Sequence, residues 1–466
     1  MSTFSGLSGA LTSLYAQRRG IDVAGQNIAN ANTEGYTRQR VNLQAVGGAP
    51  PSMYTNSHGP GQGVTVTGVT RIQDAFLETR GRLEHAQSAY LSDQDSVYAR
   101  VQEAFGEPSD NGLQSQLSDL SAAWHDLANQ PGDSAARTQV LARATNLTDS
   151  LHDSRSAMAS LFGTTREQLD AYATDINTSA AQVAALNQSI VSANLAGAPT
   201  NELADQRDTV VMHLSQLTGA TGALRDNGSI DVLLSGGGLV NGSSSRRVST
   251  AGATRLEDVT ADPVGLQWAD TRSPVSVDSG QVASMLKTVN STLPGFVGQL
   301  DQVAAALANA VNDQHTSGYD RNGDAGVPLF VTTGGSAFTA ANITVGITDP
   351  DLIAAAATTA GGAGGTLNGD NADALAGLGT AVDSADTVYR QVVVSLGVAA
   401  QAADRRVGIQ SSLTDDVDAA RQAQSGVNLD EEMTNLMSFQ RAYQAASRVI
   451  NTIDSCLDTL INHTGS

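Results

Sequence analysis

The sequence predicts a mainly α-helical protein with β insertions, in which helices from the two ends of the chain pair as a coiled coil. Apolar residues recur at helical three/four spacing through long stretches, and a heptad repeat occurs at both termini. A mid-chain region changes to the period-two alternation that is typical of strands. We therefore expect a terminal coiled coil, a central helical bundle and a small mid-chain β domain.

The clearest element is a long carboxyl-terminal helix over residues 427–462. Asn428 can cap its first turn, with Glu431 three residues later, and Asp430 adds the negative charge that a helix amino terminus favours. Its apolar seam repeats every seven residues and requires burial against another helix. The predicted interface residues are Leu436, Phe439, Tyr443, Ile450, Ile453, Leu457 and Leu460, with Ala446 completing the second row.

The amino-terminal segment carries a weaker version of the same repeat and is the candidate partner. Each of its four glycines costs a helix about 1 kcal/mol relative to alanine, so we expect the segment to be ordered only when it is packed. Alternatively, each terminal helix docks on its own globular core, but matched repeats at both ends weaken that interpretation. The predicted interface residues here are Phe4, Leu7, Leu11, Leu14, Ile21 and Ile28.

The middle of the chain alternates between helical and strand-like patterns. Helical stripes run through 80–218 and 280–312, and residues 370–425 return to helix before the terminal coiled coil. An Asn227-Gly228 turn precedes an alternating Ile230-Val232-Leu234 face, which predicts a hairpin. Short strand-like runs follow residue 326, and the Ala/Gly tract at 354–365 is typical of a linker. The predicted domains are a terminal coiled coil (1–45 with 427–466), a mainly helical core (46–221 with 280–426) and a β insertion (222–279).

Composition argues against several functions. Asp plus Glu outnumber Lys plus Arg by 47 to 26, which gives a net charge of -21 and makes nucleic-acid binding unfavourable. We expect neither a membrane span nor a secretory signal peptide, because the chain has no long apolar run and no basic segment before an apolar one. The single cysteine, Cys456, excludes an intrachain disulfide and is interpreted as a small half-buried residue.

Motifs that resemble chemical sites are incomplete. The run from Asp320 to Gly326 imitates the start of a calcium loop, but Val331 stands where a bidentate glutamate is needed, which favours a simple Asx turn. Gly236-Gly237-Gly238 has no nearby lysine, since Lys287 is the only lysine, so a phosphate-binding loop is excluded. The histidines lack metal-ligand spacing. We therefore expect no catalytic residue, no metal and no cofactor, and interpret the protein as a non-enzyme.

Residues 21–43, IDVAGQNIANANTEGYTRQRVNL, resemble the amino-terminal motif of the bacterial flagellar rod, hook and hook-associated proteins. The segment VNLDEEMTNLMSFQRAYQAASRVINTID resembles their carboxyl-terminal end. Residues 201–219, 300–330 and 367–378 are similar to the hook-associated protein 1 family in particular. The residues that match the superfamily motif, and that we expect to shape a bend after the first helix, are Asn27, Asn30, Asn32, Thr33, Gly35 and Tyr36.

The resemblance implies a structural subunit of the flagellum that joins the hook to the filament. It implies contacts with hook protein, with hook-associated protein 3 and with further copies of the chain, and an export chaperone that binds the carboxyl-terminal helix. It also implies type III export from the cytoplasm to an extracellular position, which accounts for the expected lack of a signal peptide. Two alternatives remain open: another axial subunit, such as a hook or distal-rod protein, and a secreted enzyme or adhesin with flagellar-type ends.

Overall fold

The computed structural model describes residues 3–47, 63–107, 109, 112–335, 337–358 and 368–462. The chain forms two compact units, each assembled from separate segments of the sequence. Unit 1 comprises Met1–His85, Asn177–Arg246 and Ser412–Ser466, and unit 2 comprises Ala86–Ile176 and Arg247–Ser411. Three helices, α2 (Ala75–Phe105), α4 (Ser134–Leu195) and α9 (Ala385–Ser425), contribute residues to both units.

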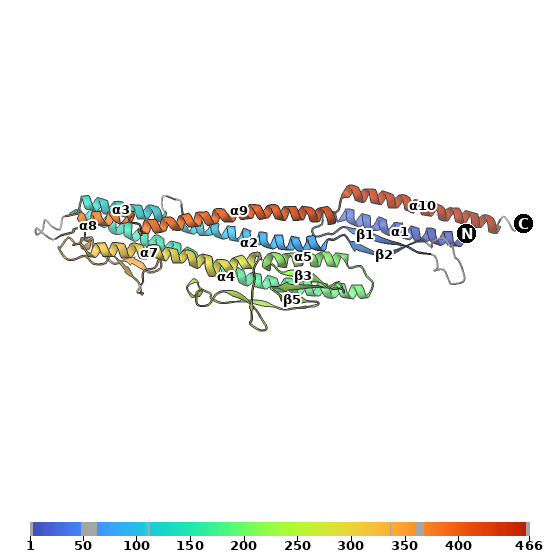
Figure 1. Cartoon of the computed structure of the whole chain (residues 1–466), viewed down its shortest axis with the longest axis horizontal. Helices are drawn as coiled ribbons and strands as arrows, with labels where there is room; N and C mark the ends of the chain where they lie inside the picture. The colour runs from blue at the N-terminus through green and yellow to red at the C-terminus, as the bar shows by residue number, and fades with distance from the viewer. Residues whose placement is uncertain are drawn as a thin grey trace. The chain divides into compact units, whose positions relative to one another are not determined.

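The terminal helices of unit 1 pack against each other, as the sequence predicts. Helix α1 (Thr3–Ala29) and helix α10 (Leu429–Asn462) lie side by side, with the start of α1 and the end of α10 at the same end of the pair (Figure 1). The side-chain oxygen of Asn428 accepts hydrogen bonds from the backbone N–H groups of Asp430 and Glu431, which confirms the predicted cap. Strands β1 (Gln39–Ala45) and β2 (Val64–Arg71) form an antiparallel pair that contacts α1.

Unit 1 also contains a small sheet that packs with two helices. Strands β3 (Thr221–Leu224), β4 (Ile230–Leu234), β5 (Gly237–Asn241) and β6 (Ser244–Ser245) form an antiparallel sheet in sequence order. Helix α5 (Asn201–Thr218) contacts β3, and Asn187 of α4 donates hydrogen bonds to the carbonyl oxygens of Ile230 and Gly242. Ile230, Val232 and Leu234 are all buried, which confirms the predicted alternating face.

Unit 2 is mainly helical. Its remaining elements are α3 (Leu113–Asn129), α6 (Gly280–Lys287), a five-residue π-helix (Thr288–Thr292), α7 (Leu293–Thr316) and α8 (Asp370–Ala376). The predicted stripes are buried as expected, and Trp124 on α3 and Leu300 on α7 are almost inaccessible to solvent. Two smaller sheets belong to this unit: β7 (Val248–Ala251) with β8 (Gly265–Trp268) and β9 (Pro274–Val275), and β10 (Phe330–Thr332) with β11 (Ile343–Val345).

Segment 222–279 was predicted as one β domain, but its strands form two separate sheets that fall in different units. The reason is that β3–β6 is tied to α4 through Asn187, whereas Asn290 of the π-helix binds the backbone of Val264 just before β8. The other predicted domain boundaries stay a prediction. In the Ala/Gly tract at 354–365, residues 359–365 lie outside the described part of the chain. Ala354, Ala355 and Ala356 are buried and are not part of an open linker.

Candidate functional site

The face on which α1 meets α10 is made of small residues. Ala16, Gly20 and Ala24 are buried in α1, although they lie outside the predicted seam. A β-carbon at Gly20 would stand 2.7 Å from the Phe439 ring, and one at Gly6 would stand 3.5 Å from Ile453. Residue 6 therefore lies opposite residue 453, and residue 20 lies opposite residue 439. Because the numbers rise along one helix as they fall along the other, the two helices run antiparallel. The glycines that weaken α1 as an isolated helix therefore allow α10 to approach closely.

The predicted seam residues occupy this helix pair but are only partly covered. Leu11 is 44% exposed, and the side chains of Phe4 and Leu460 lie outside the described part of the chain. Ala446 is the one seam residue of α10 that is buried among those described. The half-buried members are Leu7, Leu14, Ile21, Ile28, Leu436, Phe439, Tyr443, Ile450, Ile453 and Leu457. Pairing within one chain thus leaves much of the apolar seam accessible to another molecule.

A polar cluster fixes the start of α10 against the end of α1. The Asn27 amide is buried: it donates to Glu432 Oε2 at 3.0 Å and to the Gln39 carbonyl oxygen at 2.9 Å. Its oxygen accepts hydrogen bonds from the Gln39 N–H and the Tyr36 hydroxyl. Arg38 forms an ion pair with the buried Glu432, with a closest distance of 2.7 Å. Burial raises the pKa of Tyr36 to about 12, with nearby carboxylates adding to the shift, so its hydroxyl remains a hydrogen-bond donor.

The other motif residues shape the bend between α1 and β1. The Asn30 amide donates to the Gln26 carbonyl oxygen, and the Thr33 hydroxyl donates to the Asn30 side chain. Gly35 has a φ of +75°, and a β-carbon there would stand 2.5 Å from the Thr209 hydroxyl, so glycine is required on both counts. Asn32 is exposed on the turn. The predicted motif residues thus lie at or beside the bend, and Asn27, whose oxygen accepts the Tyr36 hydroxyl, also holds α10 through Glu432.

Helix α5 binds the same bend from another direction. Asp205 accepts hydrogen bonds from the Thr37 N–H and from Arg71, whose Nη1 is 2.7 Å away, and Asp208 pairs with Arg71 at 2.9 Å. Burial raises the pKa of Asp205 above its usual range, while Arg71 opposes the shift. The segment 201–219, which resembles the hook-associated family, therefore positions the bend and β2 by charge-assisted hydrogen bonds.

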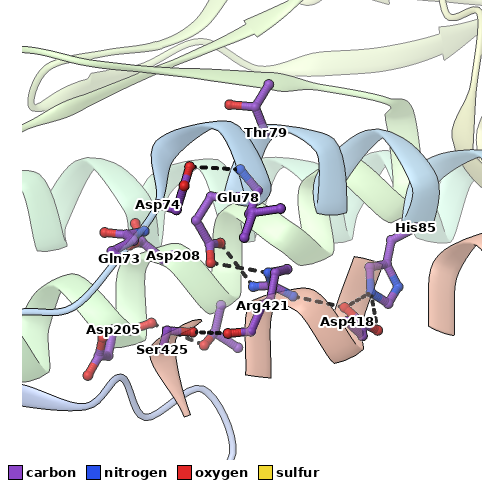
Figure 2. A network of polar contacts seen from close by, with 12 residues as sticks. Gln73, Asp74, Glu78, Thr79, His85, Asp205, Asp208, Asp418, Arg421 and Ser425 are labelled. Carbon is purple, nitrogen blue, oxygen red and sulfur yellow. Dashed lines mark hydrogen bonds and ion pairs between the residues drawn. The ribbon is translucent and has the colours of Figure 1, made fainter. Parts of the chain in front are cut away.

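A second ion-pair network joins the beginning of α2 to the end of α9 (Figure 2). Arg421 binds both carboxylate oxygens of Glu78, at 3.1 and 2.9 Å, and also pairs with Asp418. His85 lies 2.9 Å from Asp418. These side chains line a groove of about 360 Å³ with Asp205 and Asp208. Within the described residues no group of three His, Cys, Asp or Glu side chains could hold a metal, and the groove's carboxylates are largely engaged by arginine. The arrangement is suited to holding helices in place.

Sequence reasoning missed several of these features. Arg38 and Glu432 lie 394 residues apart, so no local pattern links them. The β1–β2 pair was not predicted, since β1 falls in the predicted terminal coiled-coil domain and β2 in the predicted helical core. Residues Val64-Thr65-Val66 nevertheless alternate as a strand does, and the register of the pair shifts at Thr67, between the pairs Leu43 with Val66 and Asn42 with Gly68. None of the described helices is long and apolar enough to cross a membrane.

Comparisons with known proteins support the resemblance. Residues 98–330 match the family described as the flagellar hook-associated protein FlgK helical domain. Residues 9–37 match the flagella basal body rod protein family, and residues 421–463 match the carboxyl-terminal family of the flagellar basal body rod FlgEFG proteins. The two terminal matches cover most of α1 and α10.

Full-length relatives agree with the family matches. Flagellar hook-associated protein 1 of Bacillus subtilis is 28% identical over an alignment that covers 100% of this chain and 99% of the relative. The Escherichia coli protein of the same name is 25% identical, with 98% and 99% covered. A solved structure of the flagellar hook junction protein FlgK from Burkholderia pseudomallei matches with a TM-score of 0.64 and 17% identity, covering 74% of this chain and 99% of that one, which supports the fold.

Proposed function

We propose that this chain, which belongs to the flagellar hook-associated protein FlgK family, joins the hook of a bacterial flagellum to its filament. It is a structural subunit of the flagellum. The observation that carries the proposal is the half-covered seam of α1 and α10, because such a surface is suited to burial between neighbouring subunits. We infer that the interface residues predicted from the sequence are buried in this assembly and perform no chemistry.

The proposed partners are hook protein on one side, hook-associated protein 3 on the other, and further copies of this chain. The matches to rod families at both termini support stacking on a hook, since they cover the helices that rod and hook-associated families share. The relatives are named as flagellar hook-associated proteins, which supports a function without catalysis, metal or cofactor.

An export chaperone is the proposed partner before assembly, while the chain is still in the cytoplasm. Besides its seam, α10 exposes Leu429, Met433 and Met437 at intervals of four residues, each 46% to 49% accessible. This spacing places them on one face, where they form the apolar stripe that a helix-binding groove recognises. Export through the flagellar type III pathway would then release α10 to pair with α1.

The test is complementation of a strain that lacks this chain. That strain should make hooks but shed filament subunits into the medium, and the wild-type chain should restore filaments. A chain with Ile450→Asp and Leu457→Asp should restore nothing, because each change puts a charge in an apolar interface at a cost of several kcal/mol. The matched control carries Asn451→Asp and Thr459→Asp at exposed positions of α10 and should restore filaments.

Two results would contradict the proposal. Filaments that persist in the deletion strain would remove the junction role. A seam variant that binds the chaperone and restores motility as well as the exposed-position control would show that the seam is not the assembly surface.

A further inference from the structure

A groove of about 380 Å³ lies on unit 2 between α2, α6 and α9. Its walls include Tyr90 and Gln94 from α2, Lys287 at the end of α6, and Arg406 and Ile409 from α9. Gln94 is buried, whereas both cations and Ile409 are exposed, with Ile409 65% accessible. The groove is remote in sequence from the α1–α10 seam and belongs to a different unit.

The groove concentrates positive charge in a strongly acidic protein. Lys287 is the only lysine among 466 residues, in a chain with a net charge of -21. Neither Lys287 nor Arg406 has an ion-pair partner among the residues that the structure describes. Some other arginines of unit 2 are paired, as Arg143 is with Asp119 and Arg321 with Asp351. Two unpaired cations beside an exposed isoleucine form the mixture of charge and apolar contact that is found at protein interfaces.

We propose that this groove binds a carboxylate-bearing segment of a second copy of this chain. The inference rests on the proposed function and deepens it by naming one contact between copies. Two chains that each carry a net charge of -21 repel each other, so their association requires places where cations of one copy meet acids of the next. A second copy offers 47 Asp and Glu residues. Tyr90 and Ile409 supply apolar contacts beside the ion pairs.

The single lysine makes a direct test possible. A water-soluble carbodiimide joins amines to carboxylates that are in contact, and Lys287 carries the only side-chain amine of this chain. Hook–filament junctions isolated from cells should yield a cross-linked peptide in which Lys287 is joined to an Asp or Glu of this same chain. The same link should be absent from dilute purified monomer, because it forms between copies.

Two outcomes of the cross-linking would overturn the proposal. One is a Lys287 link only to another flagellar protein. The other is an unmodified Lys287 in junctions whose neighbouring proteins show lysine cross-links in the same sample. A chain with Lys287→Arg keeps the charge but loses the reactive amine, so it should assemble normally and lose the cross-link, which verifies the peptide assignment.

Charge reversal provides an independent test. A chain with Lys287→Glu and Arg406→Glu should leave about tenfold fewer copies on isolated hooks, since like charges placed in contact oppose association. The matched control is Arg405→Glu, an exposed residue next to Arg406 that does not line the groove, and it should assemble normally. If the chain with Lys287→Glu and Arg406→Glu loses helical content when purified, a chain with the neutral changes Lys287→Gln and Arg406→Gln is used in its place. It should lose fewer copies from the hooks than the charge-reversed chain is expected to lose, but more than wild type.

Normal retention of either doubly substituted chain would overturn the groove contact. This failure is distinguishable from failure of the proposed function. If the deletion strain sheds filament subunits while the doubly substituted chain restores filaments, the result supports the junction role and contradicts only the groove contact.

Discussion

Two sets of helices in this protein show the same three/four apolar spacing but bury it to different degrees. On α3 and α7 of unit 2 the stripe is closed within one chain: Leu127 and Leu300 have no accessible surface. On α1 and α10 of unit 1 the seam residues stay half-buried, and the covered positions are small ones such as Ala16 and Gly20. The comparison teaches that a stripe completed inside the chain serves folding, whereas a stripe left incomplete is available for assembly.

The largest expected effect is a loss of stability at a core position that should exceed the loss at a seam position, whereas the two positions should rank the other way for assembly. Leu300→Ala should lower the free energy of unfolding by about 3 kcal/mol, because it leaves a cavity in a fully closed core. Ile453→Ala, at a half-buried position of α10, should cost about 1 kcal/mol in the monomer. In cells the order should reverse: Ile453→Ala should impair filament attachment more than Leu300→Ala does. Denaturant unfolding followed by hydrogen exchange measures the stability of unit 2 and of the terminal helices. Filament counts measure attachment in cells. Equal losses of stability would contradict the comparison.

Acid should affect unit 2 through a buried histidine. His315 has no accessible surface; one ring nitrogen contacts the Val327 carbonyl oxygen at 2.6 Å, and the other accepts the Ala354 N–H at 2.9 Å. Both contacts fit a neutral ring, and burial lowers its pKa to about 4. In the unfolded chain the pKa is about 6.5, so the unfolded state binds more protons between these values. Stability should therefore fall as the pH drops from 6.5 to 4, by up to about 3 kcal/mol.

The measurement compares the pH dependence of unfolding in two variants. His315→Gln should be less stable at neutral pH but should lose this acid dependence, whereas His125→Gln, at an exposed histidine, should keep it. Burial also raises the pKa of Asp93 and Asp301, which work in the opposite direction. The difference between wild type and His315→Gln isolates the histidine. Parallel pH profiles for these two proteins would show that His315 does not carry the effect.

Two adjacent glutamates at the start of α10 give a smaller, sharper contrast. Glu432 is buried and accepts hydrogen bonds from Asn27 and Arg38, whereas Glu431 pairs with Arg38 from an exposed position. Glu432→Ala should weaken docking of α10 on α1 by about 2 kcal/mol, because it removes one of the two acceptors of the buried Asn27 amide and the buried partner of Arg38. Glu431→Ala should change docking by less than about 0.5 kcal/mol. Hydrogen exchange of the α10 amides measures both, and similar exchange rates in the two variants would contradict the proposed role of the polar cluster.

Much of the fold was predictable because local spacing determines it. The stripe from Leu293 to Val311, the face formed by Ile230, Val232 and Leu234, and the Asn428 cap all follow from patterns shorter than about twenty residues. The Asx turn at Asp320 was predictable in the same way, since its side chain accepts the N–H groups of Asn322 and Asp324.

The remaining features depend on contacts between distant parts of the chain. Heptad spacing identifies which face of α10 is apolar but not how closely α1 approaches it, because that distance depends on residues without apolar bulk, such as Gly20. The link from Asn27 to Glu432 spans 405 residues and leaves no periodic signal. The assignment of the seam to contacts with other subunits therefore remains a prediction, which the seam variants test.

The smallest expected effect distinguishes two glycines of α1. A β-carbon at Gly25 would meet no atom within 4 Å, so Gly25→Ala should stabilise the helix by about 1 kcal/mol through helix propensity alone. At Gly20 the added methyl group would stand 2.7 Å from Phe439, so Gly20→Ala should gain the same propensity but force the aromatic ring away from α1. We expect Gly25→Ala to slow hydrogen exchange in both terminal helices and Gly20→Ala to speed it in α10. If both substitutions slow exchange, Phe439 adapts without loss and the close approach of the two helices does not depend on glycine.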